Sequence, residues 1–162
     1  MSLVVRPANE DDLDAAVDLY ADVAEEGRWI GGEAPVDKTE RRARFETSIH
    51  RDDARFFMAE DDGRIVGHIF IEVAGYGVAD LGMMVAADVR GRGVGSALLS
   101  AAIDWARGAG AHKVGLQVWP HNEAAIALYR KFGFEQEGRL RRHYRRRNGE
   151  LWDAVVMGLL LD

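Results

Sequence analysis

The 162-residue chain has 48% hydrophobic and 30% charged residues, which fits one domain with a packed core and excludes a disordered chain. Its net charge of −6 disfavours non-specific nucleic-acid binding, and the lack of cysteine excludes disulfides, thiolate nucleophiles and cysteine-based zinc sites. No signal peptide or membrane span is recognisable, so we expect residues 1–162 to form one cytoplasmic domain that binds no membrane and no nucleic acid.

The first half of the chain contains signals for strands and two helices. Apolar or alternating runs predict strands over residues 3–6, 55–60 and 65–73. Apolar residues at helical spacing predict one helix from an Asn9 cap to Gly27 and another over residues 36–49. Asp12 stands three residues after Asn9, as in a capping box, and Asp62-Gly63 predicts a hairpin turn.

The second half repeats this alternation of strands and helices. Strands are predicted over residues 80–85, 113–118, 134–147 and 150–160. A helix carries an apolar stripe from Leu98 to Ala106, and another runs from an Asn122 cap to Gly133. Asn148-Gly149 between the last two strands is the strongest hairpin signal in the chain.

The predicted order of elements is β-α-α-β-β-β-α-β-α-β-β. This order predicts an α/β fold with a mixed, mostly antiparallel sheet of about seven strands and four helices. Consecutive hairpins give antiparallel pairs, whereas the β-α-β unit over residues 80–118 must be parallel and right-handed.

The segment Arg90-Gly91-Arg92-Gly93-Val94-Gly95-Ser96 lies between a strand and a helix. The first turn of a helix leaves backbone N–H groups free, glycines let an anion approach them, and arginines add charged donors. The lysine of a Walker A loop is absent, and Ser96 stands where a dinucleotide fingerprint needs its third glycine. The segment is therefore another kind of phosphate loop, or a glycine-rich turn without a ligand.

Arg90-x-x-Gly93-x-Gly95 resembles the Arg/Gln-x-x-Gly-x-Gly/Ala motif of the GNAT N-acetyltransferase superfamily. A strand ending Met83-Met84-Val85 precedes it, and Asn122-x-x-Ala125-x-x-Leu128-Tyr129-x-x-x-Gly133-Phe134 is similar to the second cofactor motif of that family. The order of elements is also the GNAT order, so the resemblance spans nearly the whole chain. It implies a single-domain GNAT fold that uses acetyl-CoA as co-substrate and no metal.

The resemblance also implies a set of cofactor-binding residues. The backbone of residues 90–96 would hold the pyrophosphate, Met84 and Val85 would bond the pantetheine arm, and Val85 would lie nearest the thioester carbonyl. Asn122 would bind the cofactor, although a plain N-cap explains it equally well. The implied set is Met84, Val85, Arg90, Gly91, Arg92, Gly93, Val94, Gly95, Ser96, Asn122 and Tyr129.

For the chemistry, the resemblance implies that Tyr129 protonates the cofactor sulfur, while its alternative role is that of a core aromatic. Direct attack by an amine on the thioester needs no cysteine. The general base, acting directly or through water, is Asp80, Glu33 or Asp153, and each of these is equally explained as a surface carboxylate. The five histidines lack metal-ligand spacing, and we expect them to be solvated or locally bonded.

In this family the first interhelical loop and the last hairpin grip the acceptor, which makes Trp29, Ile30 and Glu33 candidate contacts. Packing of that loop on the sheet edge is the alternative. The hairpin carries Arg139, Arg141, Arg142, Arg145, Arg146 and Arg147. Three explanations are open for these arginines: a solvated surface, which we favour, binding of an anionic acceptor, or contact with RNA near a protein substrate.

The sequence thus predicts an N-acetyltransferase that moves the acetyl group of acetyl-CoA to a primary amine of a small molecule, an amino acid or an analogue. The last segment of the sequence is similar to acetyltransferases that act on amino acids, on phosphinothricin-type herbicides or on ribosomal proteins. The similarity does not distinguish among these three acceptor classes. The alternatives are a protein N-terminal or lysine acetyltransferase with a peptide acceptor, and a non-catalytic acyl-CoA-binding module. A homodimer is compatible with the resemblance.

Overall fold

A computed structural model describes all of residues 1–162. The strands are β1 (Leu3–Pro7), β2 (Ala54–Asp61), β3 (Arg64–Val73), β4 (Val78–Val85), β5 (Lys113–Val118), β6 (Glu135–Arg145) and β7 (Leu151–Leu160). The helices are α1 (Leu13–Glu26), α2 (Lys38–Ile49), α3 (Val94–Gly108) and α4 (Glu123–Lys131), with short 3-10 helices at Glu10–Asp12 and Ala87–Val89. The predicted order of elements and the predicted fold class are confirmed.

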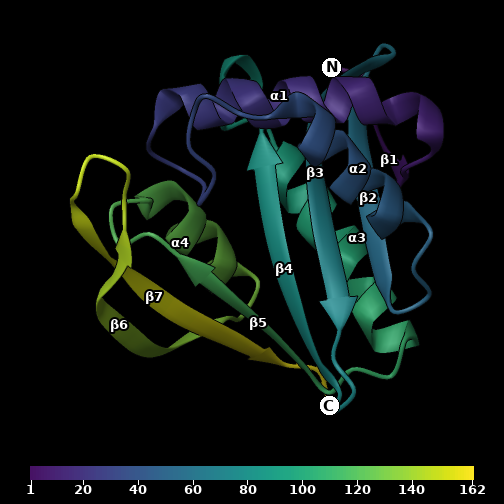
Figure 1. The fold of residues 1–162 in the computed structure, drawn as a ribbon. Coiled ribbons are helices and arrows are strands. Elements are labelled where there is room, and N and C mark those ends of the chain that lie inside the picture. Colours follow the sequence, from purple (N-terminus) through teal and green to yellow (C-terminus); the bar gives the residue numbers. More distant parts are fainter.

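All seven strands form one sheet in the order β1-β2-β3-β4-β5-β7-β6. Every neighbouring pair is antiparallel except β4 and β5, which are parallel, as the β-α-β unit requires. That parallel pairing covers only Val78–Asp80 of β4, opposite Lys113–Gly115 of β5. Beyond it the two strands diverge, and the sheet opens into a V between β1–β4 and β5–β7–β6 (Figure 1).

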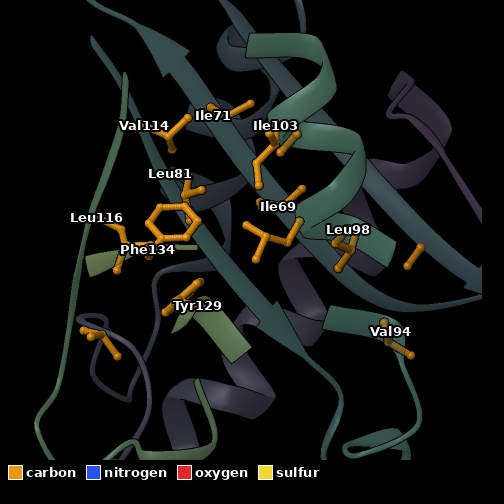
Figure 2. Packing of buried hydrophobic residues seen from close by; sticks show 14 of the residues in the cluster. Ile69, Ile71, Leu81, Val94, Leu98, Ile103, Val114, Leu116, Tyr129 and Phe134 are labelled. Carbon is orange, nitrogen blue, oxygen red and sulfur yellow. The ribbon is translucent and has the colours of Figure 1, made fainter. Parts of the chain in front are cut away.

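Helices cover both faces of the β1–β4 half. A Cβ on Gly67 of β3 would lie 3.0 Å from Leu98 and 3.0 Å from Val94, so alternate residues of β3 from Gly67 onward face α3. Ile69 and Ile71 of β3 are fully buried in that layer together with Leu98 (Figure 2), and Leu99 is fully buried in the same cluster. On the other face, α1 and α2 cover a smaller core built around Phe45, Phe56 and Met58.

Local signals explain the helix ends, with small shifts from the predicted boundaries. Asn9 and Asp12 form the predicted capping box, but its first turn is a 3-10 helix, and α1 begins only at Leu13. The second helix begins at Lys38 rather than at residue 36, because the Asp37 side chain accepts from the Glu40 N–H and caps it. No helix in the structure is long and apolar enough to cross a membrane.

Candidate active site

The opening of the V holds a large cavity of about 960 Å³. Its walls come from the β4 end, the loop before α3, α4, the end of β5, the α1–α2 region and the β6–β7 hairpin. The Ala86 N–H donates to the Val66 carbonyl of β3, and backbone groups alternate in direction along an antiparallel strand. The N–H groups of Met83 and Val85 therefore point away from β3, into the opening that β5 has left. The N–H of Met84, which was expected to bond the pantetheine arm, points toward β3 instead. A free strand edge lines the cavity.

The glycine-rich loop forms one end of this cavity. Gly93 has φ = +89° and is the N-cap residue of α3, and Gly91 has φ = +76°, a region that favours glycine. No side chain caps the first turn of α3, so its N–H groups remain available to an anion. Gly91, Gly93, Val94, Gly95 and Ser96 all line the cavity. The loop thus has the backbone geometry of an anion site.

Both arginines of this loop were expected to offer side-chain donors to an anion, and the structure does not place them so. Both nitrogens of the Arg90 fork donate to the Glu26 carboxylate at 2.7 Å, and Arg90 Nε donates to the Val85 carbonyl at 3.0 Å. Arg90 thereby fastens the loop to the end of α1 and to β4. Arg92 does not line the cavity and forms no ion pair.

The two predicted functional residues of α4 both reach the cavity. Asn122 Oδ1 accepts from the Ala125 N–H at 3.3 Å, so Asn122 is the N-cap of α4 and also part of the cavity wall. Tyr129 is 6% exposed and packs against Phe134, with 5.6 Å between ring centroids. Burial raises the pKa of Tyr129 to about 12. The phenol therefore keeps its proton at neutral pH and is available as a hydrogen-bond donor.

The three candidate bases lie in different surroundings, and only Glu33 lines the cavity. Asp80 lies at the closed end of the V, where burial and the neighbouring Glu72 raise the pKa of its carboxyl. Asp153 accepts from the Arg142 N–H at 2.6 Å and from Arg139 Nε at 2.7 Å, and these two bonds lower the pKa of its carboxyl. The structure therefore does not bring Asp80 or Asp153 to the cavity.

The candidate acceptor loop, residues 28–35, closes over the open end of the V. Trp29, Ile30 and Glu33 line the cavity as predicted. Trp119 Nε1 donates to the Ile30 carbonyl at 3.3 Å, and His121 Nε2 lies 2.6 Å from the Arg28 carbonyl. These contacts tie the loop to the segment between β5 and α4.

The hairpin holds the same loop from the other side, and this corrects the favoured expectation of a purely solvated arginine surface. Arg146 is 6% exposed, stacks 4.3 Å from the Trp152 ring, and donates to the Gly31 carbonyl at 3.1 Å. The Arg147 N–H donates to the Glu33 carboxylate. Arg139, Arg141, Arg142 and Arg145 are exposed. The hairpin is therefore partly a clamp on the loop.

His68 is the one histidine that is buried, so for this ring the expectation of solvation is wrong. It is 3% exposed and lies between the Phe45 and Phe56 rings, and its Nε2 has no hydrogen-bond partner. Burial lowers the pKa of His68 to about 4, while the Ala16 backbone acts in the opposite direction. It also lines the cavity. In the sequence, the position of His68 inside the apolar run of residues 65–71 is the signal that indicates its burial.

Comparisons with known proteins agree with this architecture. Over its full length the chain is 30% identical to an L-methionine sulfoximine/L-methionine sulfone acetyltransferase from Pseudomonas aeruginosa, covering 96% of that protein. The crystal structure of a ribosomal-protein-alanine N-acetyltransferase from Brucella melitensis superposes with a TM-score of 0.89 at 31% identity, covering 98% of this chain and 99% of that one.

A phosphinothricin acetyltransferase from Sinorhizobium meliloti, solved in complex with AcCoA, shares the fold. Its TM-score is 0.88 at 23% identity, covering 99% of this chain and 89% of that chain. The model of the Acetyltransferase (GNAT) family matches residues 13–134, from the start of α1 to the end of the second cofactor motif. The chain belongs to the GNAT family of acetyltransferases.

Proposed function

We propose that this protein transfers the acetyl group of acetyl-CoA directly to the primary amine of a small acceptor, an amino acid or an amino-acid analogue. The observation that carries the proposal is the single cavity that joins an uncapped helix N-terminus, a free strand edge and a chamber under the acceptor loop. Such a cavity can hold two substrates with their reacting ends together, which is the main source of rate in direct transfer.

The part of the cavity between the first turn of α3 and the edge of β4 fits acetyl-CoA. The uncapped first turn of α3 offers N–H donors to a pyrophosphate, and the glycines keep side chains away from it. The free edge of β4 can add an extended amide chain as a further strand, with the N–H of Met83 as donor. Acetyl-CoA supplies an activated acyl group on a sulfur leaving group. We assign the N–H of Val85 to the oxygen that gains charge during attack.

We assign Tyr129 to the departing sulfur. Its buried phenol is protonated at neutral pH, so it can donate a hydrogen bond or a proton to a developing thiolate. The amine must lose a proton, and an unperturbed amine of pKa about 10 is mostly protonated at neutral pH. Among the three candidate bases only Glu33 faces the cavity, so we assign to it, directly or through water, the removal of that proton.

The acceptor loop favours a small acceptor over a peptide. Residues 28, 30, 31 and 33 of the loop are each bonded to the β5–α4 segment or to the hairpin, so the loop closes this end of the cavity. A peptide acceptor needs an open groove along which its chain can continue. The relative that acts on methionine sulfoximine and methionine sulfone supports the same acceptor class.

Thiol release from acetyl-CoA over a panel of amines tests the proposal. The panel contains free amino acids, their sulfone and sulfoximine analogues, aminoglycosides and alanine-ended peptides. We expect free amino acids or their analogues to be the best acceptors. A preference for peptides would favour the protein acetyltransferase. Binding of acetyl-CoA with no thiol release for any amine of the panel would favour a non-catalytic acyl-CoA-binding module.

The Tyr129→Phe variant tests the assigned acid in the same assay. We expect slower turnover with unchanged affinity for CoA, because the substitution removes the hydroxyl and keeps the ring against Phe134. Equal turnover by the two proteins with the best acceptor would refute the assignment of Tyr129.

A further inference from the structure

The lining of the cavity is strongly cationic although the chain as a whole carries −6. Five arginines line it, and Glu33 is the one carboxylate. The five are Arg41, Arg44, Arg90, Arg145 and Arg146. Three of them pair with carboxylates of the protein itself: Arg44 with Glu40 at the surface, Arg90 with Glu26 and Arg146 with Glu33. Arg41 and Arg145 are left without a carboxylate partner.

These two arginines lie in different surroundings. Arg145 is exposed at the end of β6, where water solvates it. Arg41, on α2, is half-buried, and its guanidinium carbon lies 4.1 Å from the Tyr20 ring centroid and 5.7 Å from that of Phe45. A guanidinium stacked on a ring keeps its planar edge free for two parallel hydrogen bonds. Arg41 is therefore a pre-oriented cation without an anion.

Apart from Arg44 and Ser48 on the same helix, the cavity walls on the α1–α2 side are mostly apolar. Phe45, Phe56, Phe70 and Met84 line the same chamber, and His68 is neutral at physiological pH. A charge in such surroundings is weakly screened, so an oppositely charged ligand group is bound more strongly than at an exposed arginine. The chamber is suited to a molecule with one negative charge and an apolar body.

We infer that Arg41 binds the carboxylate of the acceptor, and that the chamber selects amines that carry a free carboxylate beside an apolar side chain. This inference rests on the proposed function, because the cation can act on an acceptor only if the cavity receives one. Arg41 is thereby a specificity-determining residue, contributed by a helix that the sequence signals did not connect with the site.

The test compares each amino acid with its own carboxamide, which removes the negative charge and keeps the amine and side chain. Wild-type protein should prefer the acid in kcat/KM by about ten- to a hundredfold, as for a hydrogen-bonded charge pair. In Arg41→Gln the KM for the acid should rise by a similar factor, the carboxamide should be little affected, and the preference should disappear. Arg41→Lys should restore part of it.

Arg42→Gln is the matched control, because Arg42 neighbours Arg41 on α2 but pairs with Asp14 and Glu46 outside the cavity. It should keep the wild-type preference for the acid. If wild-type protein acetylates acid and carboxamide equally well, or if Arg41→Gln slows both equally, the inference is wrong and the proposed function stands. If no amine is acetylated, both are wrong.

Discussion

His68 makes the stability of this protein sensitive to mild acid. The ring is buried between Phe45 and Phe56, and its pKa falls from an ordinary value of 6.5 to about 4. On acidification, His68 therefore binds a proton near pH 6.5 in the unfolded chain but only near pH 4 in the folded protein. Stability from this group is complete above pH 6.5 and is lost as the pH falls toward 4.

The size of the loss follows from that difference in pKa. At about 1.4 kcal/mol per pK unit, the whole window corresponds to roughly 3 kcal/mol, and about 2 kcal/mol of it should be lost between pH 7.5 and pH 5. That is a large part of the 5–15 kcal/mol that holds a typical domain together. Urea unfolding at a series of pH values measures it.

A variant isolates the contribution of this one ring. His68→Phe keeps an aromatic ring in the cluster and removes the unpaired Nε2, so its free energy of unfolding should be flatter than that of the wild type from pH 7.5 to 4.5. His143→Gln, which replaces an exposed histidine of β6, should retain the wild-type slope. Identical slopes for wild type and His68→Phe, or an NMR titration of His68 near pH 6.5, would refute the reasoning.

Two further predictions concern glycines at the two ends of the cavity. Gly93→Val places a β-branched residue at φ = +89°, which strains the backbone by about 1–2 kcal/mol or more. Calorimetry should therefore show an affinity for CoA that is reduced about tenfold or further. An unchanged affinity would contradict the assignment of the phosphate loop. A Cβ on Gly32 would overlap the Tyr20 hydroxyl, so Gly32→Ala should shift the acceptor loop and raise the acceptor KM while the affinity for CoA is kept. A parallel loss of both affinities would argue against a separate acceptor subsite.

The features that the sequence predicts are those with local causes. Positive φ at Gly91 and Gly93, the Asn122 cap and the turn at Gly149 each depend on a few neighbouring residues, so all of these segments are recognisable in the sequence. The parallel pairing of β4 and β5 followed from the length of the connection and the handedness of such units.

The remaining features depend on residues far apart in the chain. Arg90 pairs with Glu26, 64 positions away, and Arg146 bonds Gly31, 115 positions away. The motif predicts that Arg90 belongs to a phosphate loop, but only the contact of this loop with the end of α1 shows that the Arg90 side chain is already bonded to Glu26. Arg41 and His68 reach the cavity for the same reason, since α2 and β3 meet there through tertiary contacts.

In the proposed function, one cavity holds acetyl-CoA and an amine together, and the acetyl group passes directly between them. Initial rates with both substrates varied test this most directly, with the best amino-acid acceptor and the mass of the acetylated product as a check. We expect intersecting lines in the double-reciprocal plot, as for a ternary complex in a chain without cysteine. Parallel lines, together with an acetylated protein formed from acetyl-CoA alone, would contradict it.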